Sequence, residues 1–342
     1  MKIFGLENLK NILNCIAPAH IAGVDVCGIC IAKNLKRNHL CFIKGVGPLN
    51  DVQSFLSEAQ EIPEAVIFII DEKFYESKKS QMDFIDVKNI ILTSNLDFVM
   101  CELSKHFYQK KYKDRTYQLD GRKSGKVQIC PSSRLAPNVF VGENVEIGEN
   151  VIIMPGCVIM GDSRIGSDTI LYPNVVIYPE TELGKSCIIH ANSAIGSDGF
   201  GYNFLDGEHK KIWHIGGVKI GDKVEIGTAC TIDRGTFDNT IIESGSKLDN
   251  SVHIAHNCHL KSGVVVCAQS GLAGSVTVGS NTAMSGHVAI APGVKIGDQC
   301  EIVGHSAVFE NFDNKSRIAG YPAKPMKQWL RQVSAIRRLI KK

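Results

Sequence analysis

The chain has 342 residues, a formal net charge of +3 at pH 7 and 44% hydrophobic residues. This nearly balanced charge does not require a nucleic acid or an acidic membrane surface as a partner, and we expect neither. We expect no signal peptide, and the longest apolar run, Ala65–Ile70, is too short to span a bilayer.

The first 120 residues or so have no regular repeat and predict a small α/β domain. It mixes two helix-like segments, Val52–Ala59 and Leu96–Tyr112, with three strand-like segments, Val24–Ile31, Ala65–Ile70 and Asn89–Leu92. The charged stretch Lys110–Arg122, which contains a glycine, is expected to be a linker.

An aliphatic residue then recurs every six positions, with a small side chain two residues before it. The first array of aliphatic residues is Leu135, Val141, Ile147, Ile153, Ile159, Ile165, Leu171, Ile177, Leu183, Ile189 and Ile195. After Ile220, Ile226 and Ile232, the second array is Ile242, Leu248, Ile254, Leu260, Val266, Leu272, Val278, Met284, Ile290, Ile296 and Ile302. A six-residue period fits neither an α-helix nor a plain strand and is typical of a hexapeptide β-helix.

We expect three hexads to close one triangular coil, with both alternate residues of each short strand pointing inward. Glycine often follows the aliphatic residue, as at Gly142 and Gly166. We expect this position to be a corner with positive φ.

The cysteines fit a packed thiol role better than a disulfide framework. Five of the twelve occupy the small inward position: Cys157, Cys187, Cys230, Cys258 and Cys300. A reducing cytoplasm is the expected setting. Cys27 and Cys30 have the spacing of a redox or metal pair, but no second pair completes it, so ordinary packing is the preferred interpretation.

Three segments interrupt or end the repeat. Ser197–His214 is rich in glycine, aromatic and charged residues, and an insertion in a solenoid usually covers a working face. The period also slips across Asp233–Ile241. After a turn at Ile318–Lys324, Pro325–Lys342 predicts an amphipathic helix. One face of this helix is basic: Lys327, Arg331, Arg337, Arg338, Lys341 and Lys342. The expected domains are therefore residues 1–120, 121–310 and 311–342.

An interior filled with aliphatic residues leaves only the outside of the solenoid for chemistry. His253, His256 and His259 all fall on outward positions, and their spacing invites a zinc interpretation. Because they lie on two faces and the corner between them, we expect no metal there. His287 and His305 should stack one coil apart, about 5 Å; both metal binding and plain stacking stay open for this pair.

Four motifs together resemble a known family. They are Ile195–Gly201 (IGSDGFG), Cys230–Gly235 (CTIDRG), Leu248–Asn250 and Val252–Asn257 (VHIAHN). They resemble the signatures of the UDP-3-O-acylglucosamine N-acyltransferases of lipid A biosynthesis. The resemblance covers residues from about 125 to 330, and it is weaker in the N-terminal domain.

The resemblance implies a mainly β fold, a left-handed parallel β-helix with an N-terminal α/β domain and a C-terminal helix. It also implies a homotrimer with sites in the seams and no bound cofactor. The acyl donor would be the phosphopantetheine thioester of acyl carrier protein, and the acceptor an amine on an acylated UDP-glucosamine. The basic face of the C-terminal helix suits that acidic carrier, although a solvated face explains it equally well.

His256 matches the catalytic histidine of the family, a general base for the attacking amine, while a backbone N–H of a nearby coil would hold the oxyanion. The residues expected at the substrate are Phe42, Asp233, Arg234, Asp249, Asn250 and Asn257. Asp238 lies three hexads before His256 and is expected to orient it from the neighbouring coil.

The chain departs from the family at nucleotide contacts. A Phe-Leu-x-Asn-x-Lys-Tyr segment holds the uridine in the family, and here Gly45 and Pro48 replace its Asn and Tyr while Phe42 remains. A second family histidine falls at Gly293, and Glu310 stands where a basic residue is common. These changes predict a paralogue that performs the same transfer on a different or differently held acceptor.

Two other functions stay open. One is a hexapeptide transferase that uses acetyl-coenzyme A on a nucleotide amino sugar. The other is a metal-dependent or non-enzymatic β-helix similar to a γ-class carbonic anhydrase.

Overall fold

The computed structural model describes residues 26–59, 66–86, 89–112, 119–320 and 325–340. Its N-terminal part contains a parallel four-stranded sheet in the order β1-β2-β3-β4. The strands and helices of this part are β1 (Gly28–Cys30), β2 (His39–Ile43), α2 (Val46–Ala59), β3 (Ile67–Asp71), α3 (Glu72–Lys78), η2 (Lys79–Gln81), β4 (Ile90–Thr93), α4 (Leu96–Tyr112) and α5 (Gly121–Ser124).

The sequence predicted α4 with its observed bounds and the later part of α2, but it did not predict β2 or α3. Two of the expected strands, Val24–Ile31 and Ala65–Ile70, are shorter in the structure, and their starts lie outside the described residues, while Asn89–Leu92 is shifted by one residue to Ile90–Thr93. Within the expected linker, α4 continues to Tyr112 and α5 begins at Gly121, while residues 113–118 lie outside the described part.

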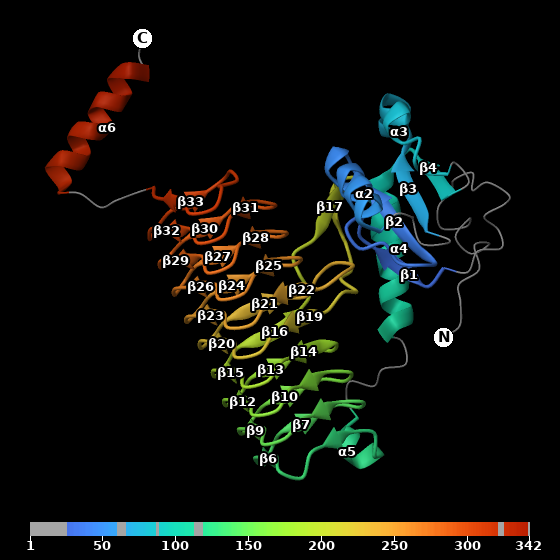
Figure 1. Cartoon of the computed structure of the whole chain (residues 1–342), viewed down its shortest axis with the longest axis vertical. Helices are drawn as coiled ribbons and strands as arrows, with labels where there is room; N and C mark the ends of the chain where they lie inside the picture. The colour runs from blue at the N-terminus through green and yellow to red at the C-terminus, as the bar shows by residue number, and fades with distance from the viewer. Residues whose placement is uncertain (1–25, 60–65, 87–88, 113–118, 321–324, 341–342) are drawn as a thin grey trace.

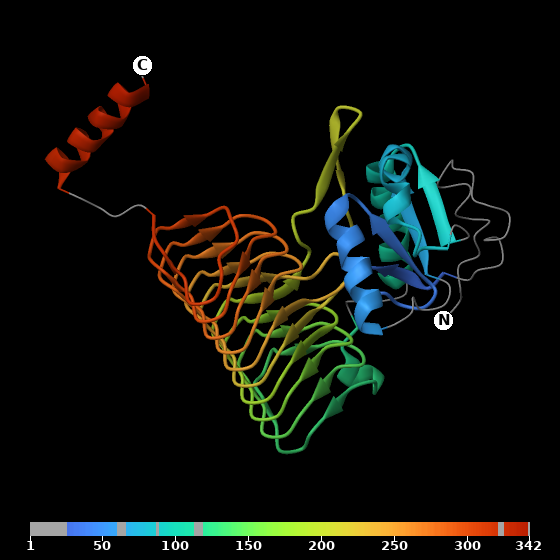
Figure 2. The ribbon, with the colours of Figure 1, turned by 45° about the horizontal axis from the view of Figure 1, so that its top comes forward.

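The rest of the chain is a parallel β-helix with three faces (Figures 1 and 2). Face one consists of β5 (Gln128–Ile129), β8 (Glu146–Ile147), β11 (Arg164–Ile165), β14 (Thr181–Leu183), β19 (Val218–Ile220), β22 (Thr240–Ile242), β25 (His259–Leu260), β28 (Thr277–Val278) and β31 (Lys295–Ile296). Face two consists of β6 (Arg134–Leu135), β9 (Ile152–Ile153), β12 (Ile170–Leu171), β15 (Ile188–Ile189), β20 (Glu225–Ile226), β23 (Lys247–Leu248), β26 (Val265–Val266), β29 (Ala283–Met284), β32 (Glu301–Ile302) and β34 (Arg317–Ile318). Face three consists of β7 (Phe140–Val141), β10 (Val158–Ile159), β13 (Val176–Ile177), β16 (Ala194–Ser197), β21 (Thr231–Asp233), β24 (His253–Ile254), β27 (Gly271–Leu272), β30 (Ala289–Ile290) and β33 (Ala307–Val308).

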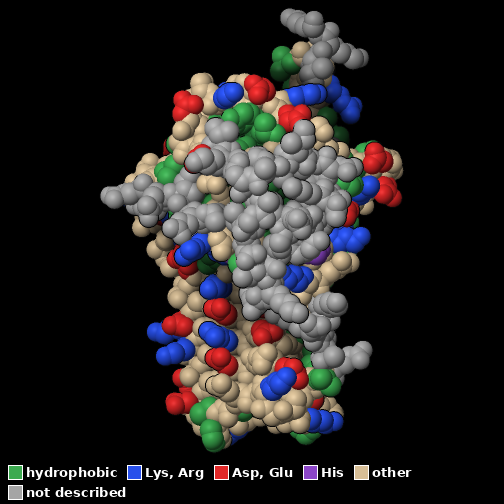
Figure 3. Space-filling model, turned by 90° about the vertical axis from the view of Figure 1, so that its right-hand side faces the viewer, with side chains coloured by type: hydrophobic (Ala, Val, Ile, Leu, Met, Phe, Trp, Pro, Cys, Tyr) green, Lys and Arg blue, Asp and Glu red, His purple; other side chains and the backbone are tan. Residues whose placement is uncertain are grey.

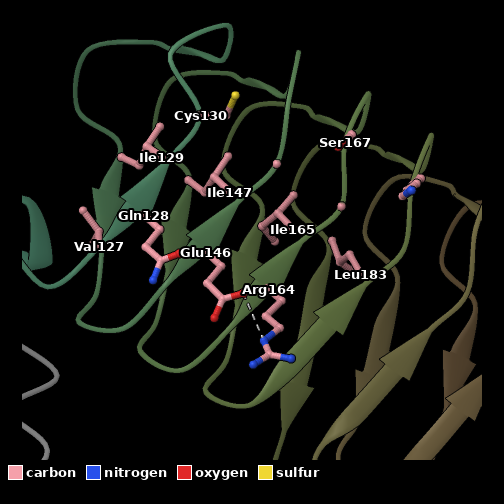
Figure 4. Close-up of a pocket in the computed structure, with 13 residues that line it drawn as sticks. Val127, Gln128, Ile129, Cys130, Glu146, Ile147, Arg164, Ile165, Ser167 and Leu183 are labelled. Carbon is pink, nitrogen blue, oxygen red and sulfur yellow. Dashed lines mark ion pairs between the residues drawn. The ribbon is translucent and has the colours of Figure 1, made fainter.

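The register confirms the predicted coil. Ile159 pairs with Ile177, a separation of three hexads, and the same separation occurs on all three faces. The aliphatic members of both arrays form one continuous core, and four of the five inward cysteines are fully buried. Figure 4 shows part of this stacking, with Ile129, Ile147, Ile165 and Leu183 in successive coils. Truncating one such aliphatic residue to alanine should cost about 2–5 kcal/mol, because the neighbouring coils cannot collapse into the space.

The expected positive φ after each aliphatic residue is wrong. Gly142 and Gly166 do not have positive φ; a Cβ there would lie 2.5 Å from Gly161 N and 2.4 Å from the Gly184 carbonyl carbon, respectively. These glycines are needed because the next coil approaches so closely. The left-handed corner lies two residues further on, and Asn is the residue most often found there, as at Asn144 (φ 58°).

Outward charges on the early coils are interspersed by sign. Arg164 Nε lies 3.3 Å from Glu146 Oε2, and Lys219 Nζ lies 3.6 Å from Glu182 Oε2 on the same face. On the side of the molecule shown in Figure 3, blue and red side chains likewise lie next to one another on the lower coils. Such exposed pairs contribute little stability, about 0–1 kcal/mol each.

Two further elements project from the stack. β17 (Tyr202–Leu205) and β18 (Glu208–Lys211) form an antiparallel hairpin inside the predicted insertion. The C-terminal helix α6 (Met326–Ile340) follows and lies clear of the coils in Figures 1 and 2. Among the described helices, none combines the length and hydrophobicity needed to cross a membrane.

The N-terminal sheet lies beside the middle of the β-helix (Figure 1). Phe42 of β2 packs against Phe237, with ring centroids 5.9 Å apart, and Asn34 donates a hydrogen bond to Asp238 at 2.9 Å. These contacts attach the N-terminal part to the corner where the six-residue period slips.

Candidate functional site

The irregular parts of the solenoid gather at the corner between face three and face one. Both the insertion between β16 and β19 and the longer connection between β21 and β22 lie there, and so does His256, between β24 and β25. A hollow of about 790 Å³ opens beside this corner. Its walls are mainly apolar and include Phe200, Ala273, Ile290, His253 and His256.

The tautomer of His256 follows from its neighbours. Asn257 Oδ1 accepts the backbone N–H of Thr236 at 3.1 Å and the Thr236 hydroxyl at 2.8 Å, which identifies this atom as the amide oxygen. The same oxygen lies 2.9 Å from His256 Nδ1, so Nδ1 must carry the proton and donate it. In the neutral imidazole the lone pair is therefore on His256 Nε2, the nitrogen that a general base would use.

The backbone of Gly274 closes on the far end of the same imidazole. A Cβ at this residue would lie 2.6 Å from both Cε1 and Nε2 of His256, so only glycine fits without displacing the ring. Among the hydrogen bonds of the described residues, the Gly274 N–H has no acceptor. A base and a free backbone donor thus lie side by side on the wall of the hollow.

A second imidazole lies against His256. His214 is fully buried, and its ring centroid is 5.2 Å from that of His256 in an edge-to-face arrangement. Burial, together with the neighbouring His256, lowers the pKa of His214 to about 4, so it is neutral at pH 7. Two glycines of the insertion provide the space, because a Cβ at Gly199 would lie 2.7 Å from His214 Nε2 and one at Gly201 would lie 2.9 Å from its Cε1.

Asp233 and His253 form a pair on the wall of the hollow. Asp233 is buried and accepts a hydrogen bond from the Ser197 hydroxyl at 3.2 Å, while its Oδ2 lies 3.8 Å from His253 Nε2. Burial raises the pKa of Asp233, and the charge interaction with His253 partly opposes this shift. Thr231 Oγ1 lies 2.8 Å from His253 Nδ1 and fixes the other side of the ring.

Arg234 points away from the hollow and holds two parts of the chain together. It is 2% exposed and donates to the carbonyl oxygens of Gly196 and Pro179 at 2.8 and 2.7 Å. It also donates to the Tyr112 hydroxyl at the end of α4. These contacts are those of a structural clamp, although Arg234 also borders a smaller hollow of about 390 Å³ together with Asp198.

Other residues expected at the substrate lie elsewhere in this chain. Asp249 and Asn250 are at the corner between faces two and three, where Asn250 accepts the Thr228 N–H at 2.8 Å and Asp249 accepts the Ala268 N–H at 3.2 Å. Phe42 is only 8% exposed and packs against Phe237. Within one chain the structure therefore brings together His256, Asn257 and Asp233, but not these three residues.

The expected role of Asp238 is wrong. Its carboxylate accepts from Asn34 and lies 3.8 Å from Lys36 Nζ, both in the N-terminal part. The period slip explains this difference, since Ile232 pairs with Ile254, which is four positions further along the chain than three hexads would place its partner. Thr236 and Asn257 orient His256 instead.

The remaining histidines have partners of their own. His259 Nε2 lies 2.7 Å from Glu243 on face one, away from His253 on face three. His287 and His305 stack as predicted, with ring centroids 4.6 Å apart and planes at 6°. In the part of the chain that the structure describes, no three His, Cys, Asp or Glu residues are placed to hold a metal ion.

A second hollow, of about 660 Å³, lies on the early coils (Figure 4). Its charged lining residues are Glu146, Arg164 and Lys185, of which the first two are exposed and pair with each other. None of the residues that line this hollow is a histidine. The hollow beside His256 is the better candidate site.

Sequence reasoning missed His214, Thr236 and Gly274. His214 was included only as the last residue of the insertion. The glycines of the same insertion, Gly199 and Gly201, were the only sign in the sequence that another group packs closely there. Thr236 acts on His256 through its side chain, and Gly274 acts through its backbone. A repeat pattern does not show which corner residues make such contacts.

Comparisons with known proteins agree with the motifs. The family model described as bacterial transferase hexapeptide (six repeats) matches residues 126–161 and 162–197. Proteins named UDP-3-O-acylglucosamine N-acyltransferase are similar to this chain: the one from Wolinella succinogenes is 42% identical over 48% of this chain and 52% of its own length, and that from Campylobacter curvus is 44% identical over 43% and 47%. The predicted resemblance is thus confirmed, and the chain spans about half the length of these curated relatives.

A solved structure, UDP-N-acetylglucosamine O-acyltransferase from Moraxella catarrhalis, is 26% identical with a TM-score of 0.42 and covers 54% of this chain and 66% of that chain.

Proposed function

We propose that this protein transfers a 3-hydroxyacyl group from the thioester of acyl carrier protein to the amine of an acylated UDP-glucosamine in lipid A biosynthesis. The observation that carries the proposal is the orientation of His256, whose Nδ1 is held by Asn257 so that Nε2 lies at an apolar hollow beside the N–H of Gly274. The similarity to N-acyltransferases of this name, over about half of their length, supports the same activity.

In the proposed reaction the amine nitrogen attacks the thioester carbonyl and His256 Nε2 removes its proton. The carbonyl oxygen becomes an oxyanion and accepts a hydrogen bond from the Gly274 N–H. The tetrahedral intermediate then collapses, the C–S bond breaks, and the imidazolium returns the proton to the leaving thiolate. The products are an amide and the free thiol of the carrier, so atoms and charge balance without a bound cofactor.

Asn257 and Asp233 have supporting roles in this proposal. Asn257 holds the Nδ1–H tautomer of His256 through the 2.9 Å hydrogen bond. Asp233 and His253 form a polar pair on a mainly apolar wall, suited to a polar group of the acyl donor or the sugar. We assign Arg234 to structure, because its guanidinium donates to two carbonyls and Tyr112.

The acceptor is proposed to reach this corner in a way that differs from the family pattern. Phe42 packs against Phe237, Gly45 has φ 100° with open space at its Cβ position, and Pro48 lies inside α2. None of these three offers an exposed aromatic face for a uracil ring. We therefore propose that residues 1–120 belong to an acceptor-binding domain whose contacts with the nucleotide have changed, and that 121–310 carry the transfer.

The proposed assembly is a homotrimer in the cytoplasm, with acyl carrier protein as partner. The exposed apolar residues Met326, Leu330 and Leu339 of α6 are consistent with a helix that packs against copies of itself, and its basic residues suit an acidic carrier. Asp249 and Asn250 lie at a different corner, so a neighbouring copy would have to bring them to a shared site.

The proposal is tested by product analysis. Purified protein is incubated with 3-hydroxyacyl-carrier protein and UDP-3-O-acylglucosamine, and the products are identified by mass spectrometry. Amide formation supports the lipid A reaction. Amide formation only with acetyl-coenzyme A, or only with another amino sugar, would overturn the donor or the acceptor assigned here.

A further inference from the structure

His214 has an unusual position for a residue outside the hexad pattern. It ends the insertion, is fully buried, and its Nδ1 lies 3.1 Å from the carbonyl oxygen of Ile212. A carbonyl can only accept, so Nδ1 carries the proton and Nε2 holds a lone pair. Among the described residues this Nε2 has no hydrogen-bond partner. A buried imidazole with one unused nitrogen needs another explanation.

The contact with His256 explains why an imidazole is buried at this position. The two rings lie edge to face at 5.2 Å, and Gly199 lies against both of them. A Cβ at Gly199 would be 2.7 Å from His214 Nε2 and 2.6 Å from His256 Cβ. At the other end of the His256 ring, a Cβ at Gly274 would lie 2.6 Å from both Cε1 and Nε2. The imidazole of His256 is thus enclosed by Gly199, His214 and Gly274.

We propose that His214 is a positioning residue: its neutral ring supports the His256 imidazole from the insertion and keeps Nε2 at the Gly274 corner. The proposal rests on the assignment of His256 as the base. It also gives the insertion a function, because the base of the β17–β18 hairpin then connects directly to the reactive ring.

The charges near His214 favour a neutral ring beside His256. The charged groups near His214 are Asp198 and Lys211, which pair with each other at 2.6 Å, and the remaining titratable neighbour is His256 itself. Because burial holds the pKa of His214 at about 4, this ring adds no positive charge beside His256 at neutral pH. A cation there would oppose formation of the His256 imidazolium during the transfer.

Two variants separate the ring from its hydrogen bond. His214→Asn keeps an N–H donor near Ile212 but removes the ring, whereas His214→Phe keeps a neutral ring and loses the donor. We expect His214→Asn to lower kcat about tenfold with KM within about twofold, because a small misplacement of a catalytic group is costly. We expect His214→Phe to stay within about threefold of the wild-type kcat.

A second readout does not depend on turnover. Diethyl pyrocarbonate modifies unprotonated imidazole, and peptide mass spectrometry gives the rate at His256 with His287 as an internal reference. The His256 rate should change at least about threefold in His214→Asn and stay near wild type in His214→Phe. Equal rates and equal kcat in all three proteins, or a Phe variant as altered as the Asn variant, would overturn the positioning role. If the wild type performs no transfer but the modification pattern holds, the proposed function fails and the positioning of His256 stands.

Discussion

Asn257 holds the imidazole of the residue before it. Its Oδ1 lies 2.9 Å from His256 Nδ1 and already accepts from the backbone of Thr236, so the direction of the hydrogen bond is fixed. Asn257 can do this because it occupies a left-handed corner with φ 60°. The same feature of the solenoid that turns the chain thus selects the tautomer of the proposed base.

Replacement of Asn257 separates these two roles. Asn257→Gly keeps the corner and removes the acceptor, so we expect at least a tenfold fall in kcat, which is about 1.4 kcal/mol. Because Thr236 also loses its acceptor, the same variant should lose about 1–3 kcal/mol of unfolding free energy. Asn257→Ala should lose the same activity and about 1 kcal/mol more of unfolding free energy than the Gly variant, because a Cβ disfavours positive φ. Kinetics and urea unfolding of both variants measure this. Full activity of the Gly variant would show that the tautomer does not depend on Asn257.

Substitution of Gly274 can be compared with a control substitution at Gly271, which lines the same hollow. Gly274→Ala places a Cβ 2.6 Å from His256 Nε2 and should reduce kcat by about a hundredfold through displacement of the ring. At Gly271 the Cβ position has no atom within 4 Å, so Gly271→Ala should leave kcat within a few fold. Equal effects of the two substitutions would mean that hollow volume, rather than contact with His256, limits the reaction.

The buried His214 predicts a pH-dependent stability. Above pH 6.5 neither the folded nor the unfolded state protonates it, so it does not affect the free energy of unfolding there. As the pH falls from 6.5 to about 4, the unfolded chain binds this proton and the folded chain does not, so stability is lost across that window. The full loss from this residue is about 3 kcal/mol.

Urea unfolding at pH 7, 5.5 and 4.5 tests this, at one protein concentration. His214→Phe should lack this loss, so the wild type should lose unfolding free energy relative to the variant as the pH falls. The same slope in both proteins would show that His214 is not buried as described.

Substitution of Arg234 tests whether this residue holds the structure together or contacts the substrate. Arg234→Lys keeps the charge but cannot reproduce three separate donors, so we expect a loss of about 2 kcal/mol in unfolding free energy with KM unchanged. Thermal unfolding and KM for the UDP-sugar measure the two effects. A raised KM at unchanged stability would show instead that Arg234 contacts the substrate.

The repeat made the β-helix predictable because each buried position is set locally. Ile159 and Ile177 occupy equivalent positions three hexads apart, and Cys157 fits the small slot whatever the rest of the chain does. The same pattern placed His256 on an outward corner. By contrast, β2 was missed because His39–Ile43 is short and nearly all buried, so it shows no alternation.

The site itself was less predictable, since it depends on where irregular segments meet. The slip before Ile254 shifts the register by four positions, which moved Asp238 to the N-terminal contact and put Thr236 beside Asn257. A single sequence does not show the geometry of such a loop. The contact of His214 with His256 likewise depends on the folding back of the whole insertion.

The central claim is that His256 Nε2 is the base of the transfer, and single-turnover amide formation tests it most directly. We would compare wild type with His256→Gln, and use His259→Gln as the matched control because His259 pairs with Glu243 outside the hollow. We expect a fall of at least about a hundredfold in His256→Gln and a nearly unchanged rate in His259→Gln. A folded His256→Gln protein that forms the amide at the wild-type rate would contradict it.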